Sequence, residues 1–248
     1  TALRDRVRAL RARSAAGARP APGPGERTAD LTSFVGRGPE VARLRRHLDQ
    51  RRLVSLVGPG GVGKTRLALR VAAAMGDRFP AGLPAVDLAV LRDPELVAQT
   101  VLDALRVPDR DSAGGDPVAA LVAHLRDREA LLVLDNCEHL LGEVARTVAE
   151  LLAAAPRLRV LVTSREPLGI GGEQVVPVAP LGLPEPPVGP AEALEHPAVA
   201  LFVDRAAAVL PGFAPGPQTV GEIVEVCRRL DGIPLAIELA AARLRVLS

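Results

Sequence analysis

The sequence predicts an α/β fold in which helices cover both faces of a parallel sheet. Short apolar runs rich in β-branched residues alternate along the chain with longer stretches in which apolar residues recur at helical spacing. Of the 248 residues, 48% are hydrophobic and 24% charged, enough to build one large domain or two modest ones. The expected strands are residues 53–57, 85–91, 130–135, 159–164 and 173–178.

Residues 1–30 differ in composition from the rest of the chain. The apolar residues of LRDRVRALRAR fall on one helical face, so residues 1–13 are expected to form an arginine-rich helix that ends a preceding domain. Residues 14–30 are rich in Pro, Gly and Ala and predict a flexible linker. The globular part is expected from residue 31. Because the chain begins with Thr and not with Met, we expect it to be a fragment of a longer protein.

Composition limits the kinds of partner and compartment. The formal net charge is only +2, and the chain has no Trp or Tyr, so the globular part lacks the basic stripe and stacking platform of a nucleic-acid-binding module. No apolar run approaches the ~20 residues of a membrane helix, so no membrane contact is expected. Cys137 and Cys227 offer neither a disulfide framework nor metal-ligand spacing, and we expect buried thiols in a cytoplasmic protein.

The first expected strand runs into GPGGVGKT, which fits the phosphate-binding pattern G-x-x-x-x-G-K-[ST] between a strand and a helix. Glycines let backbone N–H groups surround a phosphate, and the start of the following helix adds positive potential. Lys64, the only lysine of the sequence, is expected to reach the β- and γ-phosphates, where the wide guanidinium of arginine would not fit. Thr65 offers a hydroxyl to Mg²⁺. The predicted phosphate loop, which binds ATP or ADP, comprises Gly58, Pro59, Gly60, Gly61, Val62, Gly63, Lys64 and Thr65.

Two further strand ends carry candidate catalytic residues. The apolar run LLVLD ends at Asp135, whose carboxylate can hold Mg²⁺ directly or through water. An apolar strand ending in Asp is common, but one that follows a phosphate loop is a strong signal. Arg165 follows VLVTS, a place from which a cation can contact the γ-phosphate. Taken alone, an arginine after a strand is more often a solvated loop residue.

Five segments in this order resemble the STAND class of P-loop ATPases, and more narrowly the NB-ARC-type module of bacterial transcriptional regulators of the AfsR/SARP and related LuxR-like families. They are SFVGRGPEVARL, the phosphate loop, LLVLDNCEHLL, LVTSREPL and RRLDGIPLAIELAAARL. The resemblance covers residues 31–248. It implies an ASCE-type P-loop NTPase sheet in which the strand 159–164 lies between the strands that end in the phosphate loop and at Asp135.

The resemblance also implies further nucleotide-binding residues. Val35, Gly36 and Arg37 would lie along the adenine and ribose, and Arg66, next to the phosphate loop, would join the nucleotide site. The segment 232–235 matches the family's GLPL motif, in which the proline, here Pro234, packs on the base and Leu235 follows it. Proline also suits the first position of a helix, because it lacks the N–H that would need a partner there.

The resemblance divides the globular part in two. Residues 31–183 would form the nucleotide-binding domain, and a proline cluster at residues 180–190 marks the boundary. Residues 184–248 would form a small helical domain that closes on the nucleotide.

Two departures from the family pattern bear on activity. Many relatives follow the Mg²⁺ aspartate with a second acid that serves as the base for the attacking water. Here Asn136 stands in that place, and an amide cannot take a proton. Glu138 is the nearest acid, and hydrolysis is expected to be slow. The sequence also stops at Ser248, before the position at which the resemblance implies a winged-helix region, so we expect it to lack part of the switch.

Three functions are compatible with these patterns. The favoured one is a regulatory ATP/ADP switch with slow Mg²⁺-dependent hydrolysis, which controls self-association in the full-length protein and contacts DNA only through domains absent from this chain. The alternative is a P-loop enzyme or motor that hydrolyses ATP constitutively, which the Asn136 substitution disfavours. A nucleic-acid-binding module is the third, with the helix 1–13 as its one candidate contact; a solvated helix is the simpler interpretation of that segment.

Overall fold

The computed structural model describes residues 33–107 and 115–247. The helix expected over residues 1–13 and the linker expected over 14–30 lie outside the described residues.

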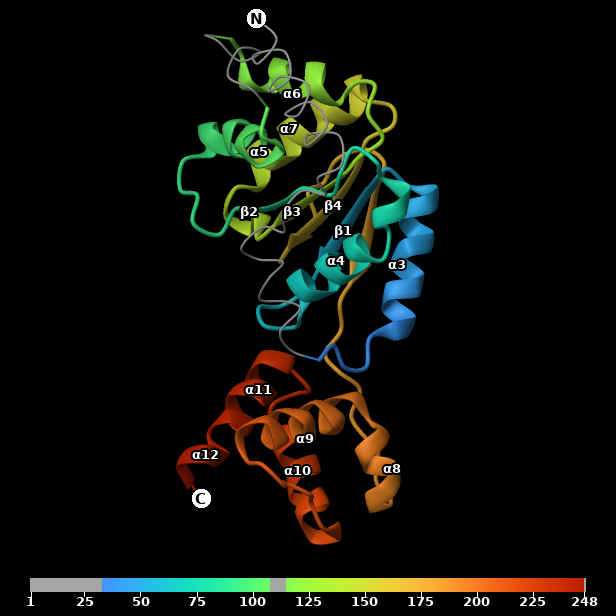
Figure 1. Cartoon of the computed structure of the whole chain (residues 1–248), viewed down its shortest axis with the longest axis vertical. Coiled ribbons are helices and arrows are strands. Elements are labelled where there is room, and N and C mark those ends of the chain that lie inside the picture. Colours follow the sequence, from blue (N-terminus) through green and yellow to red (C-terminus); the bar gives the residue numbers. More distant parts are fainter. Residues whose placement is uncertain (1–32, 108–114, 248) are drawn as a thin grey trace, which may run out of the picture.

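A five-stranded parallel sheet forms the centre of the larger part of the molecule (Figure 1). Its strand order is β2-β3-β4-β1-β5, so β4 lies between β1 and β3 as predicted. The strands are β1 Leu53–Val57, β2 Ala85–Asp87, β3 Leu131–Asp135, β4 Arg159–Ser164 and β5 Glu173–Pro177.

The second strand is shorter than the expected run over residues 85–91. The carboxylate of Asp87 accepts a hydrogen bond from the N–H of Ala89 (2.9 Å), and Leu91 N–H bonds to Leu88 O (2.9 Å). Leu88 N–H still bonds to Asp135 O (3.0 Å), and the local bonds then turn the chain away from the sheet. An Asp side chain that accepts from nearby backbone N–H groups competes with strand pairing in this way.

Helices cover both faces of the sheet, which confirms the predicted class. On one face lie α3 (Gly38–Gln50) and α4 (Lys64–Ala73), packed on Val54 and Leu56 of β1. The other face carries α5 (Val97–Leu105), α6 (Pro117–Leu125) and α7 (Leu141–Ala154), packed on residues such as Leu132 and Leu134 of β3. Along β3 and β4 the side chains alternate between the two cores, and both cores are apolar because both faces are covered.

Short 3₁₀ turns connect some of these elements: η1 Gly76–Arg78, η2 Pro94–Leu96 and η3 Cys137–His139. The last of these is joined to β3 by a single residue, Asn136.

A separate helical part follows the sheet and is built around a third apolar core (Figure 1). Its helices are α8 Pro190–Glu195, α9 Pro197–Val209, α10 Pro217–Arg229, α11 Pro234–Ala242 and α12 Leu244–Leu247. A proline opens each of the first four, where its fixed φ suits the first turn and its missing N–H costs nothing. Leu181, which lies before residue 184, already packs in this core.

The carboxyl ends of the central strands lie level with one another. Val57 of β1 stands opposite Ser164 of β4 and Pro177 of β5. The residues that follow these strands therefore meet at one edge of the sheet, the edge where ligands bind in open α/β folds. Within the described residues, no helix is both long and apolar enough to cross a membrane.

Candidate nucleotide-binding site

The phosphate loop joins the end of β1 to the start of α4 and needs its glycines. Gly61 and Gly63 have φ of +76° and +94°, a region that L side chains rarely adopt. A Cβ on Gly58 would lie 2.8 Å from the carbonyl oxygen of Val178, which continues the chain after β5. Since Val178 N–H also bonds to Val57 O (2.8 Å), the loop is held directly against the edge of the sheet.

Lys64 opens α4 and is almost completely buried. Its Nζ donates to the carbonyl oxygens of Gly58 (2.9 Å) and Pro59 (3.1 Å), so the ammonium lies inside the curve of the loop. Burial lowers the pKa of Lys64, while the nearby charge of Glu138 opposes that effect.

Asp135, at the end of β3, faces the phosphate loop. Its Oδ1 accepts hydrogen bonds from Thr65 (2.9 Å) and from Thr163 of β4, and its Oδ2 accepts one from the Asn136 amide (3.0 Å). Burial raises the pKa of Asp135, and the two threonine hydroxyls oppose that effect.

These oxygens form a fitting donor set for Mg²⁺. A carboxylate and a hydroxyl in direct contact are hard oxygen ligands of the type that Mg²⁺ takes together with phosphate oxygens and water. When bound, the ion would neutralise charge on the phosphates. Thr65 and Asp135 would hold it, as the sequence predicts; Thr163, which the sequence analysis overlooked, orients Asp135 from the neighbouring strand.

Arg165 lies at the rim of the phosphate loop, immediately after β4. Its side chain is 66% exposed, its Nε lies 3.3 Å from Glu138 Oε1, and its Nη2 lies 3.6 Å from the position of a Cβ on Gly60. The strand order thus brings Arg165, Lys64 and Asp135 to one edge of the sheet.

The segment before α3 is tied to both parts of the molecule. Arg37 is buried, and its guanidinium donates to Val62 O (3.0 Å) and Ala179 O (2.9 Å), while burial lowers its pKa. Val35 packs against the helical core, and a Cβ on Gly36, whose φ is +74°, would collide with Pro197 at the start of α9. Arg37 therefore fixes the phosphate loop through its backbone, a role that the expected ribose contact did not include.

The start of α11 contacts the phosphate loop directly. Leu235 N–H bonds to Gly61 O (3.2 Å), and the Leu235 side chain lies 3.0 Å from the position of a Cβ on Gly61. Pro234 lies 4.0 Å from the corresponding position on Gly63. The structure thus places the GLPL-like segment against the phosphate loop itself, and the expected contact of Pro234 with the base stays a prediction.

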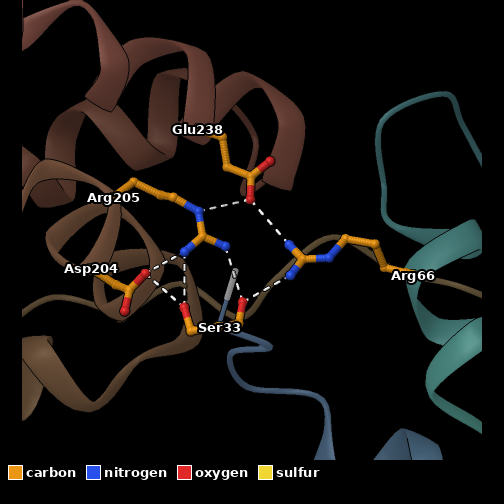
Figure 2. A network of polar contacts seen from close by, with 5 residues as sticks. All are labelled: Ser33, Arg66, Asp204, Arg205 and Glu238. Carbon is orange, nitrogen blue, oxygen red and sulfur yellow. Dashed lines mark hydrogen bonds and ion pairs between the residues drawn. The ribbon is translucent and has the colours of Figure 1, made fainter. Parts of the chain in front are cut away.

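Arg66 joins a polar network that the sequence did not reveal (Figure 2). Its Nη1 lies 3.2 Å from Glu238 of α11, and its Nη2 donates to Ser33 O (2.9 Å). Arg205 of α9 reaches the same Glu238 carboxylate (3.0 Å) and the same Ser33 carbonyl (3.0 Å), and it pairs with its neighbour Asp204. No local pattern signals the contacts with Glu238 and Ser33, because the partners are more than 30 residues apart in the sequence.

Comparison with known proteins identifies the family of the domain that contains the sheet. Residues 45–169, half of the chain, match the family model described as an AAA domain. The chain belongs to this family. The match covers β1, the phosphate loop, Asp135 and Arg165, so the AAA assignment applies to the site just described.

Curated relatives connect this AAA domain with bacterial regulators. An uncharacterized protein of Mycobacterium tuberculosis is 44% identical over 218 residues, which are 88% of this chain and 52% of that protein. A protein of the same species named as an HTH-type transcriptional regulator is 46% identical over 83% of this chain and 22% of its own length. The regulatory protein AfsR of Streptomyces griseus is 32% identical over 89% of this chain and 22% of its own length. The chain thus spans about half of the first relative and about a fifth of the others.

Solved structures agree on the fold. A STAND protein with a tetratricopeptide repeat sensor from Pyrococcus horikoshii superposes with a TM-score of 0.56 at 20% identity, over 84% of this chain and 30% of that one. Cdc6p from Pyrobaculum aerophilum gives 0.57 at 19% identity, over 86% of this chain and 63% of that one. Together with the AAA match and the regulator relatives, this confirms the predicted resemblance to a STAND-class P-loop module of regulators.

Proposed function

We propose that this chain is the ATP- and ADP-binding switch module of a bacterial transcriptional regulator, with slow Mg²⁺-dependent ATP hydrolysis. One observation carries the proposal: helix α11 of the helical part bonds through Leu235 N–H to Gly61 O, inside the loop that would hold the phosphates. We expect a nucleotide in that loop to alter or reinforce this contact, which would couple its binding to the position of the helical part.

Each candidate residue has a place in this function. Lys64 would neutralise the β- and γ-phosphates, Thr65 and Asp135 would hold Mg²⁺, and Arg165 would contact the γ-phosphate. Val35 and Gly36 would line the base and ribose between the two parts, where both already contact the helical core or α9.

The wider role follows from the relatives. Because two of them are named as regulators and are four to five times longer than the matched region, we propose that residues 31–183 and 184–248 act as nucleotide-binding domain and lid of a longer regulator. Self-association in the ATP state and contact with DNA would belong to that full-length protein.

The test is nucleotide binding by isothermal titration. Lys64→Ala should weaken ATP binding about 100-fold or more, since two charge-assisted phosphate contacts of about 1.5–3 kcal/mol each are lost. ADP binding should weaken about 10-fold or more, because ADP offers only the β-phosphate contact. Lys64→Arg should also bind poorly, because the space between Gly58 O and Pro59 O fits an ammonium and not a planar fork. Arg146→Ala, an exposed cation on α7, serves as the control and should bind normally.

Two results would contradict this assignment in different ways. A wild-type chain that binds neither ATP nor ADP would overturn the proposed function. An arginine variant with wild-type affinity would leave nucleotide binding intact and overturn the steric role of Lys64.

A further inference from the structure

Glu138 is the first acidic residue after Asn136, the position at which many relatives are expected to carry a second acid. Strand β3 ends at Asp135, and Asn136 then adopts a left-handed conformation (φ 59°, ψ 49°) that reverses the chain into η3. The turn η3 packs against the end of β4. This turn places Glu138, in the middle of η3, at the edge of the sheet where the phosphate loop lies.

The two carboxylate oxygens of Glu138 differ in their surroundings. Oε1 lies 3.3 Å from Arg165 Nε. Oε2 is buried and has no hydrogen-bond partner among the residues that the structure describes. A buried oxygen of this kind costs about 1–3 kcal/mol when it is left unpaired, so folded proteins retain few of them, and each calls for an explanation.

The surroundings of Glu138 place it beside the phosphate loop. Its partner Arg165 lies over Gly60 of the phosphate loop. Among the charged neighbours that alter the pKa of Lys64, Glu138 has a larger effect than Asp135. Glu138 is therefore electrostatically close to the ammonium that would hold the β- and γ-phosphates.

Asn136 cannot serve as the base that activates water. An amide has no basic site at neutral pH, and its NH₂ group already donates to Asp87 (2.9 Å) and Asp135 (3.0 Å). Of the two residues, Glu138 alone presents a carboxylate oxygen that is still able to accept a proton.

We propose that Glu138 is the catalytic base of ATP hydrolysis at this site, an inference that rests on the proposed function. A water oxygen attacks the γ-phosphorus while Glu138 Oε2 accepts one of its protons. The bond between the γ-phosphorus and the β,γ-bridging oxygen breaks, its electron pair leaves with ADP, and inorganic phosphate forms. Arg165 pairs with Oε1, which leaves Oε2 as the oxygen without a partner and so as the acceptor.

The decisive experiment compares Glu138→Gln with the wild-type 1–248 chain. The amide keeps the shape of the side chain but cannot accept the proton, so ATP turnover should fall about 10²–10⁴-fold. Turnover is followed as release of radiolabelled phosphate in a single-turnover assay, because the wild-type rate is itself expected to be slow. ATP and ADP affinities, measured by titration, should stay within about threefold, and ATP should remain intact in the variant's site.

Two further variants keep the result interpretable. Glu150→Gln makes the same change on the exposed side of α7, where the carboxylate pairs with Arg146, and should leave turnover unchanged. If Glu138→Gln melts well below the wild type, Glu138→Asp decides: reduced turnover with intact ATP affinity supports the base, and wild-type turnover overturns it.

The remaining outcomes separate this inference from the proposed function. Turnover of Glu138→Gln within about threefold of wild type would overturn Glu138 as the base, as would a loss of ATP affinity equal to the loss of turnover. A wild-type chain that binds ATP without releasing phosphate would overturn the inference and leave nucleotide binding in place. A wild-type chain that binds no nucleotide would overturn the proposed function itself.

Discussion

At the scale of single residues, Asn136 has a structural role, because it links the ends of β2 and β3 through hydrogen bonds. Its amide donates to Asp87 and Asp135, and its backbone N–H donates to Thr163 Oγ1 (3.1 Å). The side chain thus separates two carboxylates that would otherwise repel each other at the end of β2 and β3. Its left-handed backbone also suits Asn, which adopts that region more readily than most residues.

Asn136→Asp should therefore destabilise the protein and should not accelerate hydrolysis. The change removes two hydrogen bonds and places a third carboxylate beside Asp87 and Asp135, at an expected cost of about 1–3 kcal/mol. In a chain of this size the melting temperature should fall by roughly 2–4 °C for each kcal/mol. Thermal unfolding and phosphate release measure the two effects.

The surface offers a matched comparison for this prediction. On α5, the amide of Gln99 donates to Asp103 in the same way (2.9 Å), but in solvent. Gln99→Glu should cost only a few tenths of a kcal/mol, since exposed like charges four residues apart on a helix interact weakly. Faster hydrolysis by Asn136→Asp with unchanged stability would show that position 136 is the base position after all.

At the scale of secondary-structure elements, a two-residue turn sets the position of α11. Asp231 and Gly232 both have positive φ, and Gly232 bonds to Leu181 N–H through its carbonyl (2.9 Å) and to Cys227 O through its N–H (3.0 Å). A Cβ at Gly232 would collide with Leu181 O. This turn joins the end of α10 to the start of α11, and so determines where Leu235 meets the phosphate loop.

Gly232→Ala should lower stability by at least about 2 kcal/mol, because it adds left-handed strain to a steric collision. The melting temperature should fall by roughly 4–8 °C. Gly221→Ala is the control: Gly221 lies inside α10 with nothing near its Cβ position, and alanine should stabilise that helix by about 0.5–1 kcal/mol. Equal melting temperatures for the two variants would contradict the role assigned to the turn.

Most features encoded by local patterns were predicted correctly, apart from the length of β2, whereas side-chain contacts between distant segments were not predicted. The strands β1 and β4 match their expected bounds, because a buried parallel strand is a continuous apolar run that ends at polar or glycine residues. The phosphate loop follows from glycine and lysine spacing. The contacts of Arg66 with Glu238 and of Arg37 with Ala179 span 172 and 142 residues. No periodic pattern in the sequence indicates pairs this far apart.

At the scale of the whole molecule, the network of Figure 2 is a second connection between the sheet and the helical part. The Glu238 carboxylate accepts from Arg66 on the helix of the phosphate loop and from Arg205 on α9. The Ser33 carbonyl, from the segment before α3, accepts from the same two guanidinium groups. Because one carboxylate and one carbonyl are shared by two arginines, the network ties three separate segments together near the phosphate loop.

Glu238→Gln should loosen this connection and weaken the response to nucleotide. The affected ion pairs are partly exposed and contribute about 0.2–1 kcal/mol each, so the melting temperature should fall by a few degrees. ADP with Mg²⁺ should raise the wild-type melting temperature, since a ligand stabilises the state that it binds, and should raise that of the variant less.

Thermal unfolding with and without ADP, at about 0.05 M and about 0.5 M salt, measures this coupling. The higher salt should reduce the difference between wild type and variant, because it screens the exposed charges of the wild-type network. Glu225→Gln removes an exposed ion pair with Arg229 on α10. Neither residue belongs to the network, so this variant should leave the ADP response unchanged. A Glu238→Gln chain with the wild-type ADP response would mean that the bond between Leu235 and Gly61 couples the two parts without help from the network.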